Sequence, residues 1–118
     1  MKPDILQRSF NFGVSVIRLV HRMPKETVSH VLSRQLVRSG TSIAANVEEA
    51  QSGVNRADFS NKMGTAIKEA RETHLWLRFI RESGLVTDNL TAPLLDEAEQ
   101  VKKILWSISK KVNPYHAR

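Results

Sequence analysis

The sequence predicts an all-α fold, an antiparallel up-down-up-down bundle of four helices in a single domain over residues 1–118. The length of 118 residues suits one domain. The chain holds only five Gly and four Pro, and aromatic residues make up 6% of it, a composition that favours helices over sheets. Proline and glycine divide the chain into four apolar-periodic segments, and short connections between such helices place consecutive ones antiparallel.

The first two predicted helices meet at Pro24. The first follows Pro3 and ends before Pro24, because the residue that precedes a proline is pushed out of the helical region. The second extends from about Lys25 to Gln51, and Gly53 then suits a C-terminal cap. One face of the second helix carries the residues that we expect in the core: Leu32, Leu36, Ser39, Gly40, Ile43, Val47 and Ala50.

The third predicted helix lies between two cap signals. Asn55, with Asp58 three residues later, is close to a capping box at its start, and Gly84 marks its end. Its expected core face carries these residues: Phe59, Met63, Ala66, Ala70 and Leu77.

The fourth predicted helix has the most regular pattern. Thr87 or Thr91 opens it, with Pro93 either in its first turn or at a kink, and it ends near Pro114. Its apolar residues follow the 4-3-4-3-4 spacing of a bundle core: Leu94, Ala98, Val101, Leu105, Ile108 and Val112.

Two helices carry more apolar surface than one bundle core requires. The first has one stripe of Leu6, Phe10, Val14 and Ile17 and another of Ile5, Phe12, Val16 and Leu19. The third adds an apolar group opposite its core face: Leu75, Trp76 and Phe79. A helix that is apolar on two faces is buried on two faces, so we expect an oligomer interface with other copies of the chain. The residues assigned to this interface are Ile5, Phe12, Val16, Leu19, Leu75, Trp76 and Phe79. The alternative is that they flank a broad core.

The positive charge gathers at the end of the sequence. The net charge is +6, and the chain after residue 101 holds five basic residues and no acidic one: Lys102, Lys103, Lys110, Lys111 and Arg118. Such a cluster can neutralise phosphates, so we assign RNA or DNA binding to it. The alternative is a solvated helix face whose cations suit the helix C-terminus. Trp106, on the same helix, can stack an unpaired base or pack at the edge of the core.

Motifs for catalysis are absent from the sequence. It has no cysteine, no phosphate-binding glycine loop and no nucleophile elbow. A di-iron site in a bundle needs Glu three residues before His on two helices, and none of the four His residues follows a Glu in this way. We therefore expect a non-enzymatic protein without metal or cofactor. No apolar run is long enough to span a membrane, and no signal peptide is evident. We therefore expect a cytoplasmic location without membrane contact.

The second and third helices carry a polar pattern beside apolar positions. It comprises Arg38, Asn46, Glu49, Lys68, Glu69, Arg71 and Glu72. Charges beside a second apolar face are typical of pairs between helices or subunits, where they set register and partner choice. The alternative is a solvated face with pairs four residues apart.

Several of these segments resemble a known family. Residues 38–50 (RSGTSIAANVEEA) are similar to the signature helix of the bacterial four-helix-bundle proteins first named for reading frames in intervening sequences of 23S rRNA genes. Residues 57–59 (ADF), 68–78 (KEARETHLWLR) and 83–85 (SGL) resemble the next helix of that family and the turn after it. The similarity covers about residues 4–112. Many relatives have proline or glycine in place of Ala44 and an aromatic residue in place of Leu75.

The resemblance implies an antiparallel four-helix bundle that assembles into a homo-oligomeric ring, commonly a homopentamer. It also implies kinship with the accessory protein of diversity-generating retroelements, a basic pentameric barrel that binds nucleic acid and a reverse transcriptase. A reverse transcriptase or another protein therefore joins self and RNA or DNA among the expected partners. The family has no established enzymatic activity and supplies no catalytic residues. The function that we expect is nucleic-acid binding by a basic ring; the alternative is a structural oligomer or protein adaptor.

Overall fold

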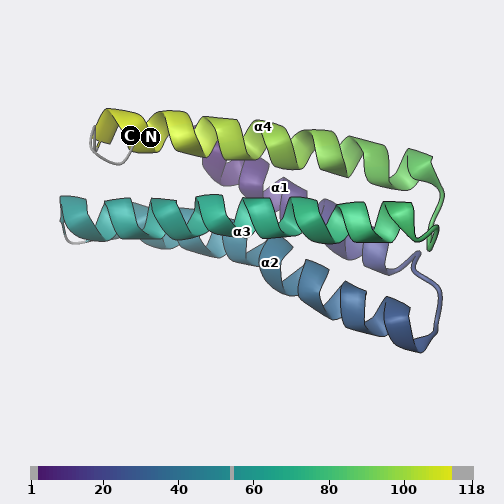
Figure 1. Cartoon of the computed structure of the whole chain (residues 1–118). Helices are drawn as coiled ribbons and strands as arrows, with labels where there is room; N and C mark the ends of the chain where they lie inside the picture. The colour runs from purple at the N-terminus through teal and green to yellow at the C-terminus, as the bar shows by residue number, and fades with distance from the viewer. Residues whose placement is uncertain (1–2, 54, 113–118) are drawn as a thin grey trace.

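The computed structural model describes residues 3–53 and 55–112, with side-chain surroundings for 5–53 and 55–111. Within these ranges the chain forms four α-helices and no strand (Figure 1): α1 Pro3–Val20, α2 Thr27–Gln51, α3 Arg56–Glu82 and α4 Asp88–Val112. The four predicted helices and the all-α class are confirmed. No helix in the described ranges is long and apolar enough to cross a membrane.

The helices lie side by side in an elongated body of 44 × 24 × 22 Å. Consecutive helices pack against each other, and α1 also packs against α4, which closes the bundle. In consequence α3 has α2 on one side and α4 on the other, and these two sides carry most of the charged residues discussed below.

Local capping explains where the helices begin and end. The Asp58 backbone N–H donates to Asn55 Oδ1 over 2.9 Å, so the predicted cap of α3 is confirmed. Gly84, with φ of +69°, takes the left-handed conformation that follows the end of α3. The cap of α2 is Glu26, whose carboxylate accepts from the Ser29 backbone N–H over 2.8 Å. Pro93 lies inside α4, within two turns of its start.

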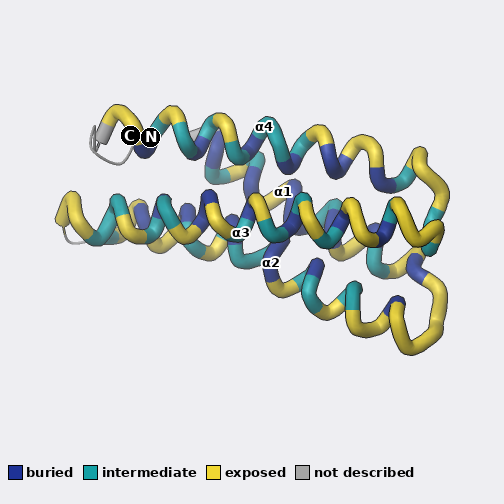
Figure 2. The backbone as a smooth tube through the Cα atoms, viewed as in Figure 1, coloured by how far each residue is buried: buried dark blue, intermediate teal, exposed yellow. Residues whose placement is uncertain are grey.

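The predicted core faces of α2, α3 and α4 are buried in the bundle (Figure 2). Leu32, Phe59 and Ile108 are half-buried at its edge, and the side chain of Val112 lies outside the described residues. The core also takes three residues of α3 that the sequence pattern did not single out: Ile67, Thr73 and Ile80. A buried hydrogen bond from Thr73 Oγ1 to Ser39 Oγ, 2.9 Å long, joins α3 to α2 inside this core.

The structure corrects the assignment of the two stripes on α1. The stripe assigned to the oligomer interface is at most 4% exposed in the single chain and forms its core: Ile5, Phe12, Val16 and Leu19. The expectation that these four residues leave the chain to meet a second copy is wrong. The other stripe is the open one, with Phe10 59% exposed and Ile17 38% exposed.

Glycine packing between α1 and α2 explains why the core takes this stripe. A Cβ at Gly40 would lie 3.0 Å from both γ-carbons of Val16, so the valine fills the space above the glycine. Gly13 is also buried, and a Cβ there would lie 3.6 Å from the Gly40 carbonyl oxygen. Two glycines allow the backbones of α1 and α2 to approach closely on the Val16 side, a preference that counting apolar residues does not reveal.

Candidate nucleic-acid interface

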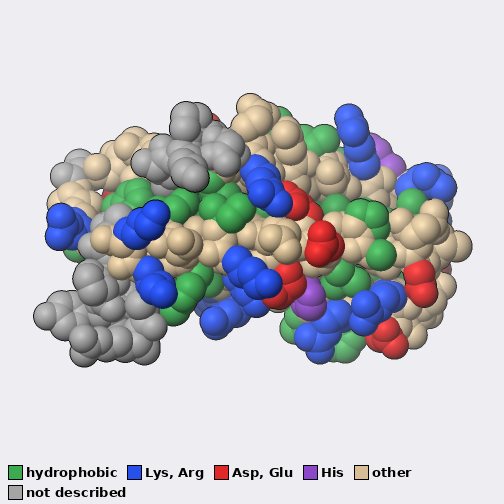
Figure 3. Space-filling model, turned by 90° about the horizontal axis from the view of Figure 1, so that it is seen from above, with side chains coloured by type: hydrophobic (Ala, Val, Ile, Leu, Met, Phe, Trp, Pro, Cys, Tyr) green, Lys and Arg blue, Asp and Glu red, His purple; other side chains and the backbone are tan. Residues whose placement is uncertain are grey.

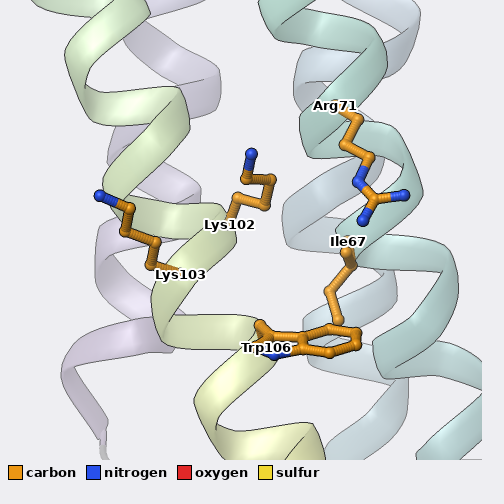
Figure 4. A pocket seen from close by; sticks show the side chains of 5 residues that line it. All are labelled: Ile67, Arg71, Lys102, Lys103 and Trp106. Carbon is orange, nitrogen blue, oxygen red and sulfur yellow. The ribbon is translucent and has the colours of Figure 1, made fainter. Parts of the chain in front are cut away.

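A groove between α3 and α4 brings together basic and aromatic side chains (Figure 4). It has a volume of about 250 Å³ and is lined by Ile67 and Arg71 of α3 and by Lys102, Lys103 and Trp106 of α4. Residues four apart on a helix lie one above the other. Ile67 with Arg71, and Lys102 with Trp106, therefore form two facing pairs across the groove.

The side chains at the groove point in different directions. In Figure 4 the Trp106 indole extends from α4 toward α3 and lies beside the end of Ile67, while the Arg71 guanidinium lies near Ile67 on the α3 side. Lys102 lies between the two helices, and the ammonium group of Lys103 points outward from α4. Ile67 is 4% exposed and Trp106 is half-buried, so the groove has an apolar floor and a charged rim.

Charges at the rim are only partly balanced. Lys102 Nζ lies 2.8 Å from Glu99 Oε1, and this hydrogen bond holds the pKa of Glu99 below its ordinary value. His74 Nε2 lies 4.0 Å from the same carboxylate oxygen, while burial lowers the pKa of His74. Arg71 and Lys103 form no ion pair with any described residue. The groove therefore presents net positive charge.

Four of the five residues assigned to nucleic-acid binding lie on α4, and Arg118 is outside the described residues. Lys102 and Lys103 reach the groove, whereas Lys110 and Lys111 are exposed in the last turn of the helix. Figure 3 views the molecule from the α4 side; the Asp and Glu side chains on this face lie mainly in its middle and right-hand parts.

Arg71 is the groove residue that sequence reasoning placed elsewhere. It was grouped with the polar pattern of α2 and α3, but its side chain lies at the α4 side of α3. The helical spacing of Ile67 and Arg71 indicates that they share a face. Which residues of α4 oppose that face depends on how the two helices are aligned, and the sequence carries no signal for this alignment.

Most members of the polar pattern hold α2 and α3 together within the chain. Arg38 bridges two carboxylates of α3, with 3.4 Å to Glu69 Oε1 and 3.1 Å to Glu72 Oε1. Lys62 Nζ lies 3.0 Å from Glu49 Oε1, and this contact raises the pKa of Lys62. The expected pairing between helices is therefore present for Glu49 and Glu72.

The remaining members behave differently. Asn46 Nδ2 donates to the Ser42 carbonyl oxygen over 2.8 Å, so this hydrogen bond lies within α2 and does not join α2 to α3. Lys68 forms no ion pair within the described part of the chain. Burial raises the pKa of Glu69, a hydrogen bond and the charge of Glu72 raise it further, and Arg38 opposes both effects.

The expected interface residues of α3 remain accessible in the single chain. Phe79 is 51% exposed and Leu75 is 36% exposed, while Trp76 is half-buried against the core. The rings of Trp76 and Phe79 are 6.0 Å apart between centroids. These side chains lie one and two turns beyond Glu72 on the same helix. In the described ranges, no cluster of three His, Cys, Asp or Glu residues could hold a metal ion.

Comparisons with known proteins agree with the fold. A family model described as "23S rRNA-intervening sequence protein" matches residues 1–107. A crystal structure from Bacteroides thetaiotaomicron, of a protein with unknown function from the S23 ribosomal protein family, is 36% identical with a TM-score of 0.83. The alignment covers 90% of this chain and 98% of that one. No curated protein matches the chain.

Proposed function

The chain belongs to the 23S rRNA-intervening sequence protein family, and from this premise we propose that it is a non-enzymatic protein that binds RNA or DNA through α4 and the groove beside it. The observation that carries this proposal is the groove itself. It brings Arg71 and Lys102 to the side of the Trp106 indole, with Lys103 at its outer edge, and the acidic residue beside them, Glu99, offsets only part of their charge.

Phosphate contacts supply the affinity in this proposal. Each cation that neutralises a phosphate releases a condensed counterion, so binding weakens linearly on a log–log scale as salt rises. Lys110 and Lys111 extend the positive charge beyond the groove along α4. Because such contacts go to the backbone, we expect binding to tolerate changes of base sequence.

We also propose that the helices alternate in direction and that the chain assembles into a ring of identical copies, five in number as the family resemblance implies. Short connections and the packing of consecutive helices support the alternating order. The exposed side chains of Phe10, Ile17 and Phe79 support self-association, because exposed apolar groups of this size commonly mark contact surfaces. In a ring the basic surface of α4 would be repeated once per subunit.

A second candidate function is that of a structural oligomer or an adaptor for a protein partner, such as a reverse transcriptase. The observation that favours it is the exposed group of Leu75 and Phe79 beside the ion pair of Arg38 with Glu72. In this case the basic residues of α4 serve solubility alone, and nucleic acid does not bind.

Binding measurements with matched variants separate the two functions. The test titrates short RNA and DNA oligonucleotides by filter binding between about 50 and 200 mM salt, where phosphate-driven binding weakens steeply. The first variant carries Lys102→Gln, Lys103→Gln, Lys110→Gln and Lys111→Gln. The control removes four exposed charges from α1, α2 and the loop between them: Arg18→Gln, Arg22→Gln, Lys25→Gln and Arg34→Gln.

We expect the α4 variant to lose most of its affinity and the control to retain most of it. Equal affinities for the two variants would remove α4 as the binding surface. If the wild type binds no oligonucleotide at low salt, the adaptor function replaces the proposal.

A further inference from the structure

The groove between α3 and α4 has the chemistry of a site for one unpaired nucleotide. We infer that a nucleobase stacks on Trp106 while the adjoining phosphate binds Arg71, so that the protein prefers single-stranded nucleic acid to duplex. This inference rests on the proposed function and adds the form of nucleic acid that the site accepts.

The size of the groove fits one base. Its volume of about 250 Å³ lies just below the range of roughly 300–1,000 Å³ for pockets that hold drug-sized ligands. A ligand of one planar ring system with its sugar outside is therefore the suitable occupant. Paired and stacked bases in a duplex do not present a ring face, whereas an unpaired base does.

The groove lining provides an apolar wall and an aromatic surface for such a base. Ile67 is buried and forms part of the wall, and the Trp106 indole lies beside it across the opening. An indole supported by packing keeps its position when the ligand leaves, so little ordering is needed on binding. Stacking on an aromatic side chain accepts any base, which agrees with the sequence-tolerant phosphate contacts expected along α4.

Among the three cations, Arg71 is the best placed to take the phosphate. Lys102 is already engaged by Glu99 at 2.8 Å, and the low pKa of that carboxyl keeps it ionised as a competitor of the phosphate. Lys103 points outward from the groove. Arg71 has no carboxylate partner among the described residues, and its guanidinium can donate two parallel hydrogen bonds to a phosphate.

The first experiment uses the fluorescence of Trp106. The chain has two tryptophans, and Trp76→Phe leaves Trp106 as the only one. The indole nitrogen of Trp76 has no hydrogen-bond partner among the described residues, so the replacement leaves none of their polar groups unpaired. Titration of the full chain with single-stranded oligothymidine should quench Trp106, whereas a duplex of equal length and inorganic phosphate should not. Equal quenching by duplex, or no quenching while the single strand binds, would overturn the inference.

The second experiment measures affinities of groove variants for both forms of the nucleic acid. Trp106→Leu should weaken single-strand binding by about 5- to 150-fold, the effect of losing one stacked base, and leave duplex binding unchanged. Trp106→Phe should restore most of the single-strand affinity because it keeps an aromatic face. Arg71→Gln should lower the log–log salt slope for a single strand by about 0.7, the value of one phosphate. The matched control, Lys68→Gln, removes an exposed charge of α3 that does not line the groove.

Circular dichroism and light scattering should confirm that every variant keeps the helix content and oligomeric size of the wild type. If Trp106→Leu keeps the affinities of the wild type for both forms while salt-dependent binding persists, the inference is wrong and the proposed function stands. If the wild type binds neither form at low salt, both are wrong.

Discussion

The two sides of α3 carry similar charged residues and use them in opposite ways. Toward α2, Arg38 of that helix meets Glu69 and Glu72, so positive and negative groups lie opposite each other within one chain. Toward α4, Arg71 and Lys102 lie on the two sides of a groove, with Glu99 as the acid at its edge. Opposite charges across two helices hold those helices together. Like charges across two helices repel, and a ligand of opposite charge relieves the repulsion.

The comparison indicates that the two sides of α3 suit different kinds of partner. The α2 side of α3 has its charges paired and continues into the exposed side chains of Leu75 and Phe79, which suits contact with protein. On the α4 side Arg71 has no ion pair with a described residue, as the proposed binding of a polyanion requires. Four variants test this division, from the largest expected effect to the smallest.

Phe79→Glu should have the largest effect. If the α2 side is an assembly surface, a carboxylate placed there without a partner costs several kcal/mol per contact and the oligomer dissociates. Light scattering at micromolar concentration would show the smaller species, and circular dichroism should show the helices retained, because Phe79 is half exposed in the chain. Phe79→Leu, which remains apolar, is the control. A wild type that is already monomeric would contradict this prediction.

Lys102→Glu should give the groove the charge pattern of the other side of α3. The new carboxylate faces Arg71 and competes with the phosphate there, so one phosphate contact is lost and the log–log salt slope for a single strand should fall by about 0.7. Filter binding over a salt series measures this change. Arg34→Glu, at an exposed position on α2, alters the net charge equally and should leave the slope close to that of the wild type. Equal slopes for the two variants would show that the groove does not bind phosphates.

Arg38→Ala should cost about 1 kcal/mol of unfolding free energy at neutral pH, because the ion pairs it removes are partly exposed. Burial and Glu72 raise the pKa of Glu69, so ionising this carboxyl in the folded state costs stability as the pH rises above its ordinary value of 4.5. Without Arg38 that cost grows. Urea unfolding should therefore show the full loss at neutral pH and a smaller loss near pH ~4. A loss that does not change with pH would argue against this pairing, and Arg34→Ala is the control.

His74→Gln should have the smallest effect. Burial lowers the pKa of His74, with Glu99 opposing, so the folded chain favours the neutral imidazole. A group whose folded pKa is lowered in this way stabilises the fold above its unfolded value of about 6.5 and loses that contribution as the pH falls. Thermal melts between pH ~8 and ~5 should show a smaller loss of stability for the variant than for the wild type. His30→Gln, at an exposed position, is the control. The same loss of stability in both variants would exclude His74 as the source of the pH dependence.

Sequence patterns predicted the helices and most of the core because these depend on local signals. The side chain of Asn55 and the backbone of Gly84 fix the ends of α3, and the spacing of Leu94, Ala98 and Val101 places one face of α4 inside. The cap at Glu26 was missed because glutamate is not among the residues usually found at such positions.

Features that depend on how two helices meet could not be predicted in the same way. The two stripes of α1 are equally apolar, and the close approach at Gly40 selects the one that contains Val16. Lys102 and Lys103 were assigned to nucleic acid from their type and spacing on one helix, and for Trp106 the sequence left stacking on a base and packing at the edge of the core as alternatives. Arg71 completes the groove from the neighbouring helix, and only the alignment of α3 with α4 reveals it.

The contact between Val16 and Gly40 limits which pairs of residues the protein accepts at positions 16 and 40. All three side-chain carbons of Val16 lie 3.0–3.2 Å from where a Cβ of residue 40 would stand, and a β-branched side chain has little rotational freedom to move aside. Alanine at position 40 would therefore require the Val16 side chain or one of the two helices to move by a few tenths of an ångström. A smaller residue 16 would make room for a larger residue 40 without such a shift, so the sizes of these two residues should vary inversely among homologous chains.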